Sequence, residues 1–418
     1  MRVLFVTIPE NTHLYSMTPL AWSFWAAGHE VRVASTPSFT ERITRTGLTA
    51  VPVGQDSPIH SGTTANREVQ ETEAAGWSEL DPAKLTYEME LERLRYTVWG
   101  LAYYNDPFLE DVVEYARFYK PDLVIWDALS FAGSIAAQAV GAAHARFLSF
   151  TDVWGGKRKV FLDLLRQAPA DLHADPFADW LGECAARNGQ EFSEELVVGQ
   201  WTIDQLPARL TVHAGGTRLP VRFTPYNGPA VIPDWLRENT DSRRVCVSLG
   251  TANTERFGGD YVSKTDIFEA LAELDNVDEV LALLLPEQAA ELGPLPKQVR
   301  VVHNVPMHAV LPTCSAVVHH GGFGSFTTSL YDGVPALAVA TPIADQVLRC
   351  RLLEESGAGL YLPHTEATPE SIRDGVHRLL TEPSFAADVQ TVRAEMLAHP
   401  TPYELVPVCE QLAGARRF

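Results

Sequence analysis

The sequence contains little cysteine, no long apolar run and no leader-like N-terminus, and each shortage excludes a class of protein. Its five cysteines are widely scattered without a Cys-x-x-Cys pair, which argues against a disulfide framework and against a zinc site. No segment approaches the ~20 uninterrupted apolar residues of a transmembrane helix. The first residues enter a strand-like segment directly and lack the apolar stretch and cleavage site of a signal peptide. We therefore expect a cytoplasmic protein with reduced thiols.

Positive charge is also scarce. The 418 residues include 33 Lys and Arg against 53 Asp and Glu, which gives a formal net charge of -20 at pH 7. A surplus of this size repels phosphate backbones and anionic lipids, so we expect the protein to bind neither nucleic acid nor membranes. An anionic small ligand would need a local binding device, because the field of the whole protein opposes it.

Three nucleotide- and metal-binding motifs are absent as well. The chain has no Gly-x-x-x-x-Gly-Lys-Ser/Thr loop, no glycine in the first strand-to-helix turn at residues 7–13, and no Asp-x-Asp at the end of a strand. These absences disfavour a P-loop NTPase, a nicotinamide-dependent oxidoreductase and a metal-dependent transferase. We accordingly expect no metal ion and no cofactor.

What the sequence does contain is an alternation of strand and helix patterns in both halves. Between the first two strands, a helix is expected to begin with Thr18 as N-cap and Pro19 as first residue, and to end at Gly28. Strands separated by helices are typical of parallel, doubly wound α/β sheets. The expected strands are residues 2–8, 30–34, 122–126, 245–249, 280–285, 299–302, 316–319 and 336–340.

The remaining segments indicate how the chain divides. Residues 58–101 and 161–198 lack strand patterns and are expected as insertions on the sheet, whereas residues 226–243 combine Asn-Gly-Pro with a charged run and indicate a linker. We therefore expect two Rossmann-like domains, residues 1–225 and 244–400, joined by that linker. The C-terminal residues 401–418 are expected to pack back toward the first domain.

The most specific motif is a glycine-rich turn, His-His-Gly-Gly-Phe-Gly-Ser at residues 319–325, which leads from an apolar strand into a helix. Glycines let main-chain N–H groups approach a phosphate, and the start of a helix adds partial positive charge. Ser325 can cap the helix or donate its hydroxyl to a ligand, and His320 can hydrogen-bond to a diphosphate. His319 should point to the opposite face and pack there. A purely structural turn is the alternative.

This turn, together with Val-Pro-Met-His at 305–308 and Leu-Pro at 311–312, resembles the donor-binding signature of family 1 glycosyltransferases. Members of that family have the GT-B fold, in which two Rossmann-like domains face each other across the active-site cleft. Residues 13–22 and 197–204 further resemble actinomycete enzymes that attach TDP-deoxysugars, often aminosugars, to macrolide or aromatic polyketides. The desosaminyltransferase of erythromycin biosynthesis is one of them. The resemblance covers residues 2 to about 411.

The resemblance implies that the second domain binds the nucleotide-sugar donor and the first domain binds the acceptor. Many relatives carry an aromatic residue that stacks on the base where this chain has Asn304, which leaves the mode of base recognition open. A simple turn is an equal alternative for Thr251, and a helix-start charge is the alternative for Asp345. The implied donor-binding residues are Thr251, Asn304, Val305, His320, Gly321, Gly322, Gly324, Ser325, Asp345 and Gln346.

Two residues of the first domain are candidates for catalysis. His13 follows the first strand in an expected loop, where a neutral imidazole could take a proton from an acceptor hydroxyl. Asp127 follows the strand at 122–126 and could orient that imidazole, although it could instead be the N-cap of a helix at 130–140. Trp77, Trp99, Tyr103 and Tyr104 could line an acceptor pocket, with packing in the core as the alternative.

From the motifs and the resemblance we expect an inverting, metal-independent transfer of a deoxysugar, often an aminosugar, from a TDP-sugar to a hydroxyl of a polyketide aglycone. A non-catalytic GT-B protein that binds nucleotides is the main alternative, followed by a nicotinamide-dependent oxidoreductase. The resemblance also implies a cytochrome-like helper protein, for which the two insertions are candidate docking surfaces. A homodimer stays open.

Overall fold

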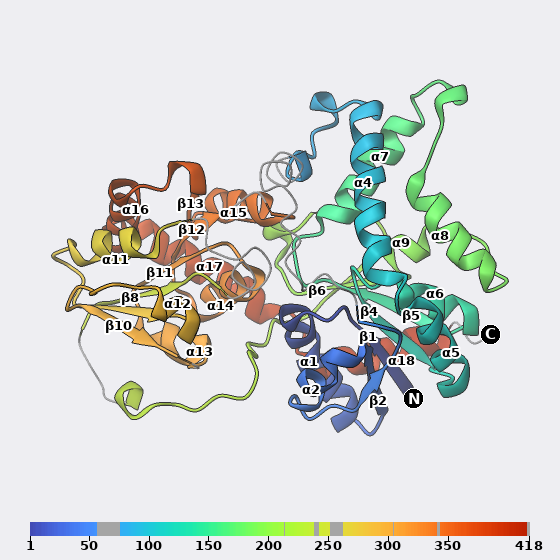
Figure 1. Cartoon of the computed structure of the whole chain (residues 1–418), viewed down its shortest axis with the longest axis horizontal. Coiled ribbons are helices and arrows are strands. Elements are labelled where there is room, and N and C mark those ends of the chain that lie inside the picture. Colours follow the sequence, from blue (N-terminus) through green and yellow to red (C-terminus); the bar gives the residue numbers. More distant parts are fainter. Residues whose placement is uncertain are drawn as a thin grey trace.

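The computed structural model describes residues 1–56, 76–212, 214–237, 242–250, 262–303, 305–340 and 343–415. These residues form two domains, each built around one sheet, and the chain runs from the first to the second through an extended connection (Figure 1). Within the described residues no helix is long and apolar enough to cross a membrane.

The first domain has a seven-stranded sheet in the order β3-β2-β1-β4-β5-β6-β7, and all its strand pairs are parallel. Successive side chains of the central strands enter opposite cores: Leu4 and Val6 lie on one face, and Val3 and Phe5 on the other. Burial on both faces explains why these strands are continuous apolar runs. The strands are β1 (Arg2–Val6), β2 (Glu30–Ser35), β3 (Ala50–Pro52), β4 (Leu123–Asp127), β5 (Ala143–Phe147), β6 (Trp201–Asp204) and β7 (Thr217–Pro220).

Helices cover both faces of this sheet, and the two expected insertions add further helices. Helices α4 and α7 are joined by a buried ion cluster, in which Glu90 contacts Arg93 and accepts a hydrogen bond from Lys157 at 3.2 Å. The helices are α1 (Asn11–Ala26), α2 (Thr40–Thr44), α4 (Tyr87–Asn105), α5 (Leu109–Tyr119), α6 (Phe131–Val140), α7 (Val153–Leu165), α8 (Pro176–Arg187) and α9 (Glu195–Val198).

The second domain has a six-stranded, all-parallel sheet in the order β10-β9-β8-β11-β12-β13. Its strands are β8 (Arg244–Ser248), β9 (Glu279–Leu283), β10 (Val299–Val302), β11 (Ala316–His319), β12 (Ala336–Ala340) and β13 (Gly359–Pro363). Its helices are α11 (Lys264–Ala272), α12 (Pro286–Ala290), α13 (Met307–Val310), α14 (Phe323–Asp332), α15 (Gln346–Glu355), α16 (Pro369–Thr381) and α17 (Pro383–Ala398). The expected class, α/β with two doubly wound parallel sheets, is confirmed.

The last helix, α18 (Pro402–Ala415), lies against the first domain (Figure 1). Its side chains Leu405, Val406 and Cys409 are buried in the same core as Leu14 and Phe24 of α1. After the second domain the chain therefore returns to the first domain and ends in its core. The two domains are connected both by the linker and by α18.

The start of α1 differs from the prediction. The helix begins at Asn11, with Glu10 as N-cap, and Pro19 lies inside it rather than at its first turn. Proline removes the N–H that would bond to the carbonyl of Tyr15, which costs about 3 kcal/mol in a helix interior. Burial of the apolar face of α1 outweighs that cost. His13 therefore lies in the first turn of a helix and not in a loop, whereas the helix end at Gly28, with φ 89°, is confirmed.

Candidate active site

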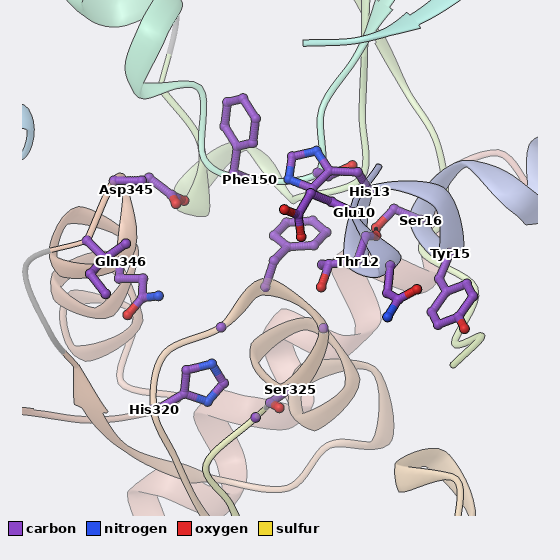
Figure 2. A pocket seen from close by; sticks show the side chains of 18 of the residues that line it. Glu10, Thr12, His13, Tyr15, Ser16, Phe150, His320, Ser325, Asp345 and Gln346 are labelled. Atoms are coloured by element: carbon purple, nitrogen blue, oxygen red, sulfur yellow. Dashed lines mark hydrogen bonds between the residues drawn. The ribbon is translucent and has the colours of Figure 1, made fainter. Parts of the chain in front are cut away.

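A cavity of about 750 Å³ lies between the two domains. The first domain lines it with residues that follow β1, β4 and β5, and the second with residues that follow β8, β9, β11 and β12. Ligands of doubly wound proteins bind at the carboxyl ends of parallel strands, so the cavity is where this architecture predicts a binding site. Figure 2 shows His13 and Phe150 on one side of it, with His320 and Ser325 opposite.

His13 and Asp127 form a side-chain pair at the first domain's edge of the cavity. The imidazole Nδ1 of His13 contacts Oδ2 of Asp127, and the other carboxylate oxygen accepts the N–H of Leu129 at 2.8 Å. Asp127 is fully buried. In the tautomer that carries its proton on Nδ1, His13 donates to Asp127, and Nε2 is then the basic nitrogen. The alternative role for Asp127 is wrong, because Ser130 is the N-cap of α6.

The glycine-rich turn places the start of α14 at the opposite wall. Gly321 has φ 85°, which favours glycine, and Gly322 is the N-cap. The helix therefore begins at Phe323 and the predicted cap at Ser325 is wrong. Ser325 instead lies in the first turn, with its hydroxyl 3.4 Å from that of Ser248. The first N–H groups of a helix have no intrahelical partner, so this turn presents donors at the cavity.

The imidazole of His320 lies in a slot between two glycines. A Cβ atom at Gly250 would lie 2.2 Å from Cε1 of His320, and one at Gly322 would lie 2.3 Å from Nε2. Neither glycine could be replaced without displacing the ring. The slot holds His320 beside the start of α14.

His319, one residue earlier, faces the core as expected. Its Nδ1 accepts the N–H of Gly321 at 3.0 Å, and its ring packs edge-on against Phe326. Burial lowers the pKa of the His319 imidazole from 6.5 to about 3. The neutral ring therefore supports the turn from behind.

Asp345 and Gln346 line the cavity at the start of α15. The carboxylate of Asp345 is 4% exposed, contacts Arg349 and accepts the N–H of Thr151 at 2.7 Å. Val305 also lines the cavity. Two other predicted residues, Thr251 and Asn304, lie outside the described residues.

The predicted acceptor residues separate into two groups. Trp77 lines the cavity, with its ring 4.4 Å from that of Trp154. Trp99 and Tyr103 are 66% and 38% exposed and lie away from the cavity, which corrects the prediction for these two residues. Tyr104, which was also predicted, does line the cavity, because the helical repeat of α4 places it on the same face as Thr97 and Leu101.

Several residues at the cavity escaped the sequence analysis. Gln288 is buried, and its amide links the loops after β8 and β9 by donating to the carbonyl of Gly250 at 3.2 Å and accepting the N–H of Leu285 at 2.9 Å. The strand-end rule that pointed to Thr251 applies equally to β9 and could have found its loop. The other residues missed include Glu10, Tyr15, Phe150, Tyr226, Asn227, Leu283, Leu284, Val302 and Met307. Among the described residues no cluster of His, Cys, Asp or Glu could hold a metal ion.

Comparison with known proteins gives full-length matches. Two family models match, the N-terminal domain of erythromycin biosynthesis protein CIII-like proteins over residues 22–250 and the C-terminal domain over residues 266–412. The aclacinomycin-T 2-deoxy-L-fucose transferase of Streptomyces galilaeus is 44% identical, with 100% of this chain and 97% of the relative covered. The 10-deoxymethynolide desosaminyltransferase of Streptomyces venezuelae is 42% identical, with 100% and 98% covered. The solved glycosyltransferase VinC in complex with dTDP has a TM-score of 0.88 at 39% identity, with 99% of this chain and 100% of that chain covered.

Replacement of His319 should change how stability depends on pH. Because the native pKa of His319 lies below that of the unfolded chain, acid protonates the unfolded state first. The free energy of unfolding should fall by up to about 1.4 kcal/mol per pH unit below pH 6.5. His319→Asn retains an acceptor for the N–H of Gly321 but does not titrate. Urea unfolding at about pH 7 and about pH 5 should show a smaller loss in this variant than in the wild type.

His173→Asn, which removes an exposed imidazole, is the control and should follow the wild type. Equal losses in wild type and His319→Asn would contradict the lowered pKa.

Proposed function

Because this chain belongs to the erythromycin biosynthesis protein CIII-like family of glycosyltransferases, we propose that it transfers a deoxysugar from a TDP-sugar to a hydroxyl of a polyketide aglycone. The GT-B fold and the enzyme class expected from the sequence are confirmed by these relatives. The observation that carries the proposal is the placement of the His13–Asp127 pair across one cavity from His320 and the start of α14 (Figure 2).

The donor diphosphate binds at the start of α14 in this proposal. The N–H groups of the first turn, the Ser325 hydroxyl and the His320 imidazole supply donors to its oxygens, and the helix terminus supplies partial positive charge. Gly321, Gly322 and Gly324 allow the close approach. This is a local anion site, as a protein with a net charge of -20 requires.

The nucleoside and sugar extend from the diphosphate along the second domain's wall. Apolar side chains at the ends of β9 and β10 and just after them, namely Leu283, Leu284, Val302 and Val305, supply a surface for the thymine ring and its methyl group. Thr251 and Asn304 complete the donor set by resemblance. Gln346 faces the cavity where a sugar hydroxyl would need an amide partner (Figure 2).

In the proposed reaction, Nε2 of His13 removes the proton from an acceptor hydroxyl while the hydroxyl oxygen attacks the anomeric carbon. The bond from that carbon to the diphosphate oxygen breaks, and TDP leaves with the electron pair. Asp127 stabilises the imidazolium that forms. Attack from the His13 side and departure toward α14 on the opposite side correspond to inversion at the anomeric carbon. The donors at α14 and His320 meet the leaving group's charge without a metal ion.

The acceptor binds against the first domain. Trp77, Trp154, Phe150 and Leu101 provide apolar and aromatic walls in the same cavity as His13, which suits a large, mostly apolar aglycone. An aminosugar as the donated sugar and a cytochrome-like helper protein stay predictions from the resemblance, and a homodimer stays open.

His13→Ala should lower the rate of transfer by about 10²–10⁴-fold, because general-base catalysis contributes on this scale. The affinity for TDP should stay within about 2-fold, since His13 lies across the cavity from the diphosphate site. Transfer measured by mass spectrometry and TDP binding measured by calorimetry test both parts. His173→Ala is the control for loss of an exposed imidazole. Turnover at the wild-type rate in His13→Ala would remove His13 from the mechanism.

Chelation should leave the reaction unchanged. The leaving group is neutralised by protein donors in this mechanism, so transfer in excess EDTA should proceed at the untreated rate. A loss of transfer that added Mg²⁺ or Mn²⁺ restores would replace the metal-independent mechanism with a metal-dependent one.

The glycine slot should be necessary for donor binding. Gly250→Ala and Gly322→Ala each displace the His320 ring, and TDP affinity should fall at least about 10-fold, since a charge-assisted hydrogen bond contributes roughly 1.5–3 kcal/mol. Gly293→Ala, where a Cβ meets no atom within 4 Å, is the control. Unchanged calorimetric affinity in both slot variants would show that the position of His320 is immaterial to binding.

A further inference from the structure

A buried ion pair at the start of α15 lies between the glycine-rich turn and the first domain. Arg349 is 2% exposed and Asp345 is 4% exposed. Arg349 contacts the main chain of the second domain, and Asp345 contacts the main chain of the first. The position of the pair between two functional walls of the cavity suggests more than a contribution to packing.

Arg349 holds the glycine-rich turn. Its guanidinium donates to the carbonyl of Gly321 at 2.6 Å and lies 5.6 Å and 5.4 Å from the ring centres of Phe323 and Phe326. Gly321 directly precedes the N-cap of α14. Arg349 therefore binds the carbonyl side of the turn, and the N–H groups at the start of α14 are left to the cavity.

Asp345 reaches the first domain. Its Oδ2 accepts the N–H of Thr151 at 2.7 Å, which is a hydrogen bond across the domain boundary. Thr151 is fully buried and directly follows Phe150, whose ring lies 6.2 Å from that of His13. On the other side of Thr151, the Asp152 carboxylate pairs with Arg146 at 3.0 Å, so the segment is anchored in its own domain.

The backbone next to Asp345 is also unusual. Ala344 has φ 47°, a left-handed conformation that residues with a Cβ rarely adopt. Such strain persists where surrounding contacts compensate for it. Here it occurs at the residue before Asp345, whose carboxylate contacts both Thr151 and Arg349.

We propose that Asp345 and Arg349 are positioning residues that fix the donor turn relative to the catalytic base. The connection runs from the Gly321 carbonyl through Arg349 and Asp345 to the N–H of Thr151, and from there through Phe150 to His13. In this proposal Asp345 acts through its hydrogen bond with the N–H of Thr151. The catalytic consequence rests on the proposed function, because misplacement of reacting groups by ~1 Å can cost about 10²-fold in rate.

The first test needs no substrate. Hydrogen–deuterium exchange, read at single-residue level in the full chain, reports on the N–H of Thr151. Asp345→Ala should accelerate its exchange at least about 10-fold, because the buried acceptor is lost, and Asp345→Asn, which retains an oxygen, should restore most of the protection. Glu382→Ala, which breaks the exposed pair with Arg378 on α16, is the control and should leave Thr151 unchanged.

The second test is kinetic. Asp345→Ala should lower kcat about 10²-fold, with a smaller change in the dissociation constant of TDP. Thr151→Pro removes the N–H and should lower kcat to a similar extent, whereas Thr151→Ala retains it and is the matched control. Adding Thr151→Pro to Asp345→Ala should lower kcat little further, because the bond between the Thr151 N–H and Asp345 is already lost in Asp345→Ala.

Unaltered exchange at Thr151 in Asp345→Ala overturns the proposal, and a loss of rate that depends on which donor sugar is used would then assign Asp345 to the sugar. If Thr151→Pro does not fold, the exchange result decides. A wild-type protein that transfers no sugar would contradict the proposed function, while the exchange experiment would still test the connection between the domains.

Discussion

The parallel arrangement of both sheets is the constraint on which the site depends. In a parallel sheet the carboxyl ends of all strands lie on the same side, and here these sides of the two sheets face one cavity. Residues far apart in sequence, such as His13 after β1 and Asp127 at the end of β4, therefore meet without any special loop. The same rule brings Gly250 beside His320, since β8 and β11 are neighbours. The strands therefore determine which residues meet at the site, and the loops add the remaining contacts.

The electrostatics of the cavity explain how an acidic protein can hold a diphosphate. Arg349 is neutralised by Asp345, and the lowered pKa keeps His319 uncharged, so neither side chain brings a net positive charge to the glycine-rich turn. The attraction in the proposed site comes from oriented N–H groups at the start of α14 and from His320. Such donors act at short range, where the charge of the distant surface is screened over about 8–10 Å. Tight binding of a diphosphate is therefore compatible with a net charge of -20.

The elements that could be predicted from the sequence are those marked by buried apolar runs and by glycines at their ends. Strands 299–302, 316–319 and 336–340 coincide with β10, β11 and β12 for that reason. Prediction failed where a tertiary contact overrides a local signal, as when core packing draws Pro19 into the interior of α1. It also failed where only orientation distinguishes residues of one type, as for Trp77 and Trp99. The bond from Thr151 to Asp345 could not be predicted, because every residue except proline carries the same N–H group.

The position of His13 in a helix changes how the base is held. A loop histidine would depend on local contacts, but α1 is packed against α18, which arrives from the second domain. The helix that carries the base is thus fixed from behind by α18, and its imidazole is oriented by Asp127 and flanked by Phe150. Phe150 in turn adjoins the residue that bonds to Asp345. The position of the catalytic base therefore depends on contacts between the two domains. Substitutions at these contacts should lower the rate of transfer more than they lower the affinity for the nucleotide.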